Sequence, residues 1–197
     1  MTRLPSEDRR RQIADAALKV IAERGLGRFT TASIAAEIGV SDGALFRHFA
    51  SKDEIVAAAL DRAEERLFEG FPPPHADPLA RLEAFFRQRA ALLAEAPVIA
   101  RLAFSDELPH AAGPAGAEQV ARWRARSLAF LRACLEEAVA GRQAPADLPI
   151  GATASLIVGA LLALGQLGGP PERAGELWGL VARSWARAET PTRQEAT

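Results

Sequence analysis

The sequence lacks the residues that a secreted, disulfide-bonded protein would need. Cys134 is its only cysteine, so no disulfide can form within the chain, and a reducing compartment suits it. The N-terminus is charged from Arg3 onward and contains no apolar segment of signal-peptide length. We therefore expect a cytoplasmic protein.

The sequence also lacks the alternating apolar and polar residues of β-strands, and valine and isoleucine are sparse beside alanine and leucine. An all-α fold of about nine helices is expected, with Thr31, Ser41 and Ser51 as N-caps and a capping box between Ser51 and Glu54. The helices are expected at about residues 6–24, 31–39, from 41, 52–69, 77–94, 97–108, 118–140, 150–167 and 172–189, with a loop at 109–117.

A constellation of catalytic or metal-binding residues is missing as well. The three histidines, His48, His75 and His110, fall in different elements. Glu107 and His110 have the spacing of half a di-iron site, but Pro109 interrupts the helix and there is no second copy. Phosphate-loop glycine motifs are also missing. We therefore expect no enzyme, no catalytic residue, no metal and no cofactor.

Charge is nearly balanced, at −1 for the whole chain, but it is unevenly distributed. Nine basic and six acidic side chains give residues 1–52 a charge of +3, which leaves −4 for the remainder. A basic N-terminal segment followed by an acidic remainder is typical of a protein that binds a polyanion through its N-terminal segment. Chance asymmetry is the alternative.

Residues 40–54, VSDGALFRHFASKDE, contain two helix starts and follow a helix that ends at Gly39. Two helices joined by a short turn predict a helix-turn-helix, whose second helix lies in the DNA major groove. Gly43 and Ala44 would permit close approach to DNA, while Arg47 and His48 would project outward. Thr30, Thr31, Ser41 and Lys52 stand at helix starts, where they could contact phosphate.

Each of these residues also has a plainer interpretation. Ser41 and Thr31 could be helix caps alone, and His48 and Lys52 could be solvated surface residues. The helix-turn-helix also occurs in proteins that do not bind DNA. A helical protein-interaction adaptor therefore remains the alternative function.

Residues 9–60 resemble the N-terminal domain of the TetR family of bacterial transcriptional regulators, with its spacing of the ERG turn, the GVS turn and the HF-x-SK element. The resemblance implies a homodimer of all-helical subunits. Its domains would be a helix-turn-helix DNA-binding domain at 1–52 and an effector-binding and dimerisation domain at 53–197, connected by the helix at about 52–69. By position, the DNA contacts would come from Thr31, Ser41, Gly43, Ala44, Phe46, Arg47, His48 and Lys52.

The resemblance has departures that matter for DNA recognition. Phe46 stands where the family most often has tyrosine, so a phenolic hydrogen bond to phosphate is lost. Asp42 and Ala44 replace commoner basic and hydroxyl residues, so base preference does not carry over. The basic run at residues 9–11 could reach neighbouring phosphates or the minor groove, or it could simply be solvated.

Small residues recur four apart in the expected helix at 150–167, and apolar residues line the helix that follows. This pattern favours close helix packing in a four-helix bundle between two chains, and the resemblance also places the dimer interface here. The expected interface residues are Gly151, Ser155, Gly159, Ala163, Leu177, Val181 and Trp185, although Trp178 and Trp185 could instead be core. The uncharged stretch 148–171 is long enough for a membrane span. Its polar and glycine residues and the lack of a flanking lysine cluster or aromatic belt favour a buried helix, and we expect no membrane partner.

A ligand pocket would lie among the helices between residues 77 and 167. The expected lining residues are Phe85, Phe86, Arg89, Leu102, Phe104, Gln119, Trp123, Ser127, Phe130, Leu161 and Gln166. The aromatics among them could equally be plain core. The expected effector is small and apolar or amphipathic, and an anion if Arg89 faces inward. The function predicted is a ligand-responsive regulator, a repressor released from a palindromic double-stranded operator.

Overall fold

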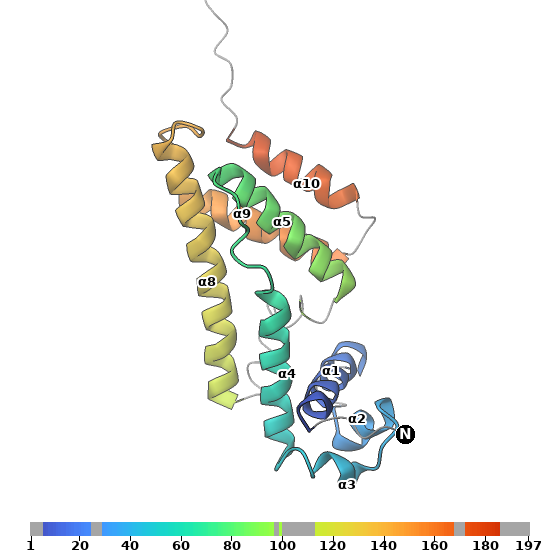
Figure 1. The fold of residues 1–197 in the computed structure, drawn as a ribbon. Helices are drawn as coiled ribbons and strands as arrows, with labels where there is room; N and C mark the ends of the chain where they lie inside the picture. Colours follow the sequence, from blue (N-terminus) through green and yellow to red (C-terminus); the bar gives the residue numbers. More distant parts are fainter. Residues whose placement is uncertain (1–5, 25–28, 97–98, 100–112, 168–171, 186–197) are drawn as a thin grey trace, which may run out of the picture.

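The computed structural model describes residues 6–24, 29–96, 99, 113–167 and 172–185, and within them the regular secondary structure is all α-helix (Figure 1). This confirms the predicted fold class. The helices are α1 (Ser6–Arg24), α2 (Thr31–Glu37), α3 (Asp42–Leu45), α4 (Lys52–Leu67), α5 (Pro78–Glu95), α8 (Gly113–Ala140), α9 (Ile150–Leu167) and α10 (Glu172–Arg183). Apart from Ile99, the helix expected at 97–108 lies outside the described residues.

Helices α1, α2, α3 and most of α4 enclose one apolar core, which we call the head core. It contains Ile13, Val20, Phe29, Ile34, Leu45, Phe49, Ile55 and Leu60, and it extends to Val120 and Trp123 of α8. The spacing of these residues along each helix places them on one inward face. The head is therefore packed against the rest of the chain through α4 and the start of α8.

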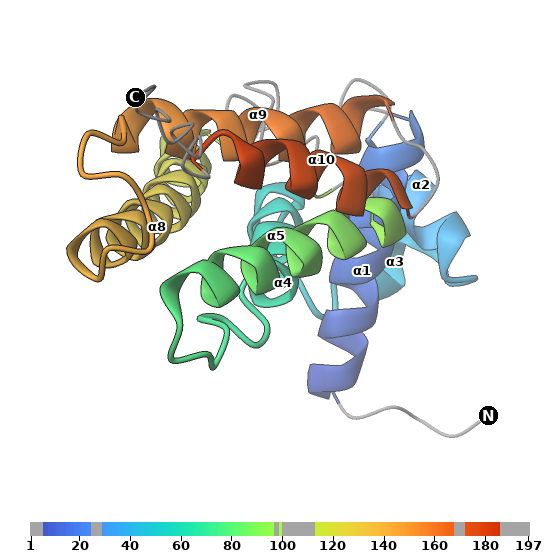
Figure 2. The ribbon, with the colours of Figure 1, turned by 90° about the horizontal axis from the view of Figure 1, so that it is seen from above.

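A second cluster, the body core, lies among α5, α8, α9 and α10. It contains Leu82, Phe86, Leu131, Leu135, Ile157, Trp178, Val181 and Trp185. Figure 2 shows α9 and α10 side by side, with α5 next to them. Figure 1 shows α4 running from the head toward the body alongside α8. Helix α4 thus connects the two cores.

The helices begin close to the predicted residues, but the capping interactions differ from those predicted. Thr30, not Thr31, caps α2: its hydroxyl accepts a hydrogen bond from the Ser33 N–H, and the Ser33 hydroxyl accepts one from the Thr30 N–H, each at 3.1 Å. Ser41 stands at the N-cap of α3 but makes no side-chain capping bond. Gly39, with φ of +67°, turns the chain between α2 and α3, a conformation that favours glycine.

Two helix boundaries were predicted wrongly. Helix α8 begins at Gly113 and not at Glu118, so part of the expected loop is helical. Pro114 lies in its first turn, where the missing N–H had no intrahelical partner to lose, and this is why a proline- and glycine-rich segment can still start a helix. Helix α10 ends at Arg183, earlier than the predicted end near residue 189.

Most of helix α9 is not buried within the chain, contrary to the expectation of a buried helix. Ala154, Ile157 and Leu161 face the body core, whereas Leu156 is 47% exposed. The helix is long and apolar enough to cross a membrane, but core helices of soluble proteins can have the same length and composition. Only 22% of it is buried within the chain. The other face of α9 lacks a cover among the described residues.

The body core should carry a large part of the stability. Leu135 on α8 is completely buried, so Leu135→Ala should lower the free energy of unfolding by about 2–5 kcal/mol through lost transfer energy and the cavity left behind. Urea denaturation followed by circular dichroism measures this. The neighbouring exposed Glu136 provides the control, because Glu136→Ala should change stability by about 0.5 kcal/mol or less. Equal effects would contradict the assignment of this core.

Candidate nucleic-acid interface and ligand cavity

The helix-turn-helix is held onto the head core by two side chains. Leu45 and Phe49 are 0% and 1% exposed and pack into that core. Helix α3 is a single turn, and the chain continues as a turn in which the His48 and Phe49 N–H groups bond to the Leu45 carbonyl at 2.9 and 3.1 Å. The recognition element is therefore short, with its apolar side fixed.

The opposite side of this element carries the residues expected to meet DNA. Gly43 and Arg47 are exposed and Phe46 is 48% exposed, while Ala44 and His48 are half-buried. A Cβ atom added to Gly43 would meet nothing within 4 Å, so the fold itself leaves this position open. The buried Nδ1 atom of His48 has no hydrogen-bond partner in the described part of the chain. These residues form one accessible surface.

The remaining predicted contacts surround α3. Thr30 and Ser41 are exposed, and Thr31 is half-buried. Lys52 is exposed at the start of α4, with its Nζ atom 5.2 Å from the centre of the Phe29 ring. None of these side chains is buried, and the ammonium group of Lys52 lies on the surface of the head.

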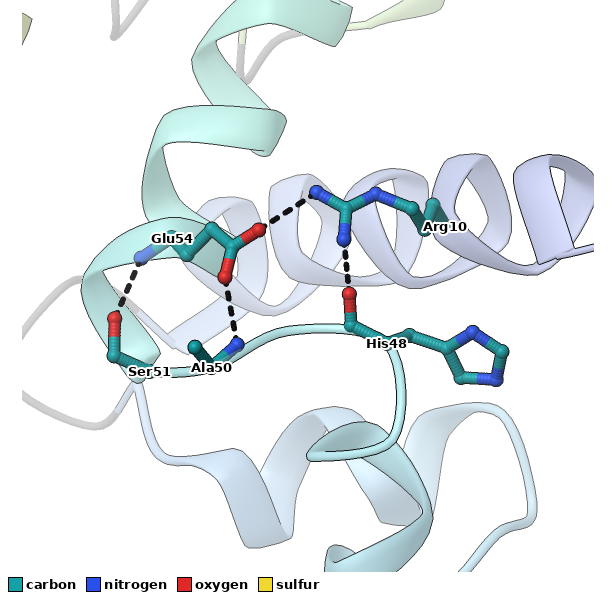
Figure 3. A network of polar contacts seen from close by, with 5 residues as sticks. All are labelled: Arg10, His48, Ala50, Ser51 and Glu54. Atoms are coloured by element: carbon teal, nitrogen blue, oxygen red, sulfur yellow. Dashed lines mark hydrogen bonds and ion pairs between the residues drawn. The ribbon is translucent and has the colours of Figure 1, made fainter.

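A polar network fixes the end of the recognition element between α1 and α4 (Figure 3). The Arg10 guanidinium donates to the His48 carbonyl and, at 2.8 Å, to the Glu54 carboxylate. Glu54 also accepts from the Ala50 N–H at 2.6 Å, and its own N–H donates to the Ser51 hydroxyl at 3.1 Å. We call this network the Arg10–Glu54 clamp. It ties three separate segments of the head together.

The clamp corrects two expectations. Glu54 reaches back to Ala50 and not to its cap residue Ser51, so the predicted capping box is only half formed. Arg10 is not a free surface arginine, because its guanidinium lies 4.1 Å from the centre of the Phe49 ring and pairs with Glu54, although its side chain is 42% exposed. Hydrogen bonds from Arg10 and then from the Ala50 N–H lower the pKa of the Glu54 carboxyl from its ordinary value of 4.5.

The body contains a cavity of about 290 Å³ between α4, α5, α8 and α9. Its wall is mostly leucine, valine and aromatic. The lining residues are Leu67, Phe85, Arg89, Leu93, Trp123, Arg124, Ser127, Leu128, Leu131, Ser155, Val158 and Leu161. A hollow of this size and composition is typical of a small-molecule site.

Sequence reasoning found part of this cavity. The residues named in advance that line this cavity are Phe85, Arg89, Trp123, Ser127 and Leu161, whereas Leu102 and Phe104 lie outside the described residues. The other predicted lining residues were wrong. Phe86 is buried against Trp178 with ring centres 5.4 Å apart, Phe130 packs on Phe71 at 4.9 Å, and Gln166 is exposed near the end of α9. Helical spacing identified Phe86 and Phe130 as inward-facing but could not tell core from cavity.

The missed lining residues come mainly from α4, α8 and α9. Leu67 was expected only as part of the apolar stripe of α4, and Ser155 only as part of the dimer surface. Their inclusion depends on how α4 and α9 cross α8, which one helix's periodicity does not show. Gln119, a candidate polar lining residue, instead donates to Asp61 and Glu64 of α4 at 2.9 and 2.8 Å.

Arg89 is the charged residue at the centre of this region. It is 6% exposed, and its guanidinium carbon lies 4.9 Å and 5.0 Å from the ring centres of Phe68 and Phe85. Burial lowers the pKa of Arg89 to about 10, and the nearby charge of Arg126 acts in the same direction. Its Nη2 atom and the Nε1 atom of Trp123 have no hydrogen-bond partner within the described ranges. Two buried donors therefore remain unused.

The expected dimer surface is only partly exposed. Gly151, Ser155 and Gly159 are exposed and Ala163 and Leu177 are half-buried. Val181 and Trp185 were predicted wrongly, because both are buried within the single chain and belong to the body core. Trp185 packs against Trp178 with ring centres 5.7 Å apart. The exposed leucines Leu156 and Leu162 of α9 were not predicted as interface residues.

Comparison with known proteins relates the head to a protein family. Residues 13–59 match the model of bacterial regulatory proteins of the tetR family. The chain is 43% identical over 63 residues to the nucleoid occlusion factor SlmA of Pasteurella multocida, a match that covers 32% of this chain and 32% of that protein. The chain thus spans about a third of this curated relative.

Solved structures match over most of the chain. The TetR family transcriptional regulator PfmR of Thermus thermophilus aligns with a TM-score of 0.74 at 22% identity, over 89% of this chain and 99% of its own. AibR, solved in complex with isovaleryl coenzyme A and operator DNA, aligns with a TM-score of 0.70 at 19% identity, over 89% and 97%. At these identities the likeness establishes the shared fold.

The Arg10–Glu54 clamp should make stability depend on pH. Because the folded-state pKa of Glu54 is lowered, its contribution is complete above the ordinary carboxyl pKa and disappears as pH falls through the lowered value. At pH 7 Glu54→Gln should therefore lower the melting temperature slightly, and the difference from the wild type should vanish in strong acid. Asp53→Asn, at the exposed neighbouring position, is the control. A pH-independent difference for Glu54→Gln would contradict the clamp.

Proposed function

We propose that this chain, which belongs to the TetR family of bacterial regulatory proteins, is a DNA-binding transcriptional regulator controlled by a small molecule. It would act in the cytoplasm, and the proposal assigns it no reaction. The observation that carries the proposal is the recognition element itself. Leu45 and Phe49 fix one side of it in the head core, while Phe46, Arg47 and Gly43 face outward.

The exposed side of α3 suits the major groove. Gly43 adds no side chain where the helix would approach base edges, and Arg47 can donate two hydrogen bonds to a guanine or grip a phosphate. Phe46 offers only apolar contact, for example with a thymine methyl group. Thr30 keeps a hydroxyl proton to donate to phosphate, because its oxygen acts as the acceptor in the cap. These features support direct reading of a duplex.

A second copy of the chain would complete the DNA-binding unit. The open face of α9 carries Gly151, Ser155 and Gly159 beside exposed Leu156 and Leu162. A Cβ atom on Gly159 would meet nothing within 4 Å, so the single chain does not require glycine there, whereas close helix packing between subunits does. Two recognition elements need a palindromic operator with half-sites about one helical turn apart, or a multiple of it.

Helix α4 offers a path from cavity to DNA. Its first residues belong to the head, and Leu67 at its end lines the cavity. A ligand that favours a different tilt of α4 would change the separation of the two recognition elements, with a coupling of about 1–3 kcal/mol per site. We propose that the free protein represses and that ligand binding releases it. AibR, which has the same fold, was solved with both isovaleryl coenzyme A and operator DNA, and this supports a regulator that has a ligand site as well as a DNA-binding site.

Lys52 should contact phosphate. Lys52→Ala should weaken binding to every duplex and reduce the slope of log affinity against log salt by about 0.9 for each phosphate contact removed. Electrophoretic mobility shifts at several salt concentrations, with the DNA upstream of the protein's own gene, measure this. Arg132→Ala, on the exposed side of α8, is the control. An unchanged slope would contradict the phosphate role, and failure of the wild type to bind any duplex would favour the adaptor alternative.

Arg47 should read a base. Arg47→Ala should then relax discrimination at one operator position by about 1–3 kcal/mol. Affinities for a set of operators with single substitutions measure this. A uniform loss on all sequences would instead show that Arg47 contacts the DNA backbone.

Gly159 should lie at the subunit interface. Gly159→Leu should preserve the folded chain, because the position is open, but it should shift the protein from dimer to monomer in sedimentation equilibrium. Replacing the exposed Glu136 of α8 with leucine adds a similar apolar side chain elsewhere and should leave the dimer intact. A dimer unaffected by Gly159→Leu would place the interface on another surface.

A further inference from the structure

The cavity wall contains hydrogen-bond donors and cations but no acid. Its polar side chains are Arg89, Arg124, Trp123, Ser127 and Ser155, and none of the described lining residues is an aspartate or glutamate. The wall is otherwise leucine, valine and phenylalanine. The buried Arg89 therefore places a positive charge in surroundings of low polarity, which strengthens electrostatic attraction.

Arg89 is incompletely compensated where it stands. A buried cation needs a partner, because removal from water is costly. The rings of Phe68 and Phe85, with centres 4.9 and 5.0 Å away, supply only cation–π attraction. The neighbouring Arg126, 4.1 Å from the Phe68 ring centre, adds charge of the same sign. The buried Nη2 atom has no acceptor in the described part of the chain.

A second hollow of about 300 Å³ also borders Arg89, and it contains Glu69 and Glu95. Neither carboxylate bonds to the Nη2 atom, and Glu95 lies 3.8 Å from Arg66. The acids nearby therefore do not satisfy the guanidinium. The unused donor of Trp123, in contrast, belongs to the wall of the apolar cavity.

The size of the cavity limits the ligand. A cavity of about 150 Å³ holds one benzene molecule, so a volume of about 290 Å³ accommodates about a dozen non-hydrogen atoms. A nucleotide-bearing carrier would not fit inside. Leu93, Leu128, Leu131, Val158 and Leu161 provide an apolar wall for the remainder of the molecule.

We propose that this cavity binds a small carboxylic acid, whose carboxylate pairs with Arg89 and whose hydrocarbon part lies against the leucine-rich wall. A planar carboxylate matches the edge of a guanidinium, and the indole N–H of Trp123 is a second donor in the wall. The proposal names the chemical class of the effector and in this respect rests on the proposed function. A cationic or purely apolar compound would leave Arg89 unpaired.

Decanoate, which has the expected size, is the probe. Isothermal titration calorimetry without DNA should show decanoate binding the wild type at least tenfold more tightly than decanol, with no binding of decylamine. Arg89→Gln should lose at least tenfold in affinity for decanoate and leave decanol unchanged. Arg126→Gln removes a nearby exposed charge that does not line the cavity, and it should change decanoate affinity less than Arg89→Gln does.

Equal affinity for decanoate and decanol on the wild type would overturn the inference, even if Arg89→Gln failed to fold. Binding of decyl phosphate or decanoyl coenzyme A with no binding of decanoate would overturn it as well. A mobility shift with operator DNA separates the two proposals. Decanoate binding without any DNA binding would refute the proposed regulatory function and support the ligand site. DNA binding without carboxylate binding would support the regulatory function and refute the proposed ligand class.

Discussion

Helix α4 packs in the head core and also borders the cavity with its last residue, Leu67, and the rest of the structure depends on this double constraint. Ile55 and Leu60 are buried in the head core, while Leu67 reaches the cavity wall. Gln119 of α8 holds the middle of α4 through Asp61 and Glu64. Because packed interiors transmit strain, α4 is the element through which the proposed ligand would act on the head. The connection is a solid element and not a flexible linker.

At the N-terminal end of α4, the clamp joins this helix to the end of the recognition element. Arg10 of α1 bonds both to Glu54 of α4 and to the backbone of His48. Helix α3 is only one turn long, and a single turn has little stability of its own. Its orientation therefore depends on Leu45 and Phe49 below it and on this polar network at its end.

The helices and the apolar core of the head could be predicted from the sequence, because caps, glycine turns and apolar spacing act locally there, but the Arg10–Glu54 clamp between distant segments could not. Local signals also mislead by one residue, as Thr30 and Thr31 show, since adjacent threonines are equally good caps. The cavity could be predicted only in part. Arg89 was identified because an arginine on an apolar stripe is unusual, but Val181 and Trp185 have the same spacing whether they face a partner or α5. Whether such residues face a partner or the core depends on how the helices cross in three dimensions, which the sequence pattern does not show.

Gly39 and Gly43 show two different reasons for a glycine. The positive φ of Gly39 is demanded by the turn itself, whereas Gly43 and Gly159 stand where the isolated chain has room for a side chain. Alanine within a helix is more favourable than glycine by about 1 kcal/mol. Laboratory evolution for heat resistance alone would therefore tend to replace Gly43 and Gly159, and the more stable protein would carry side chains at the two positions where we propose that DNA and a second subunit approach the backbone.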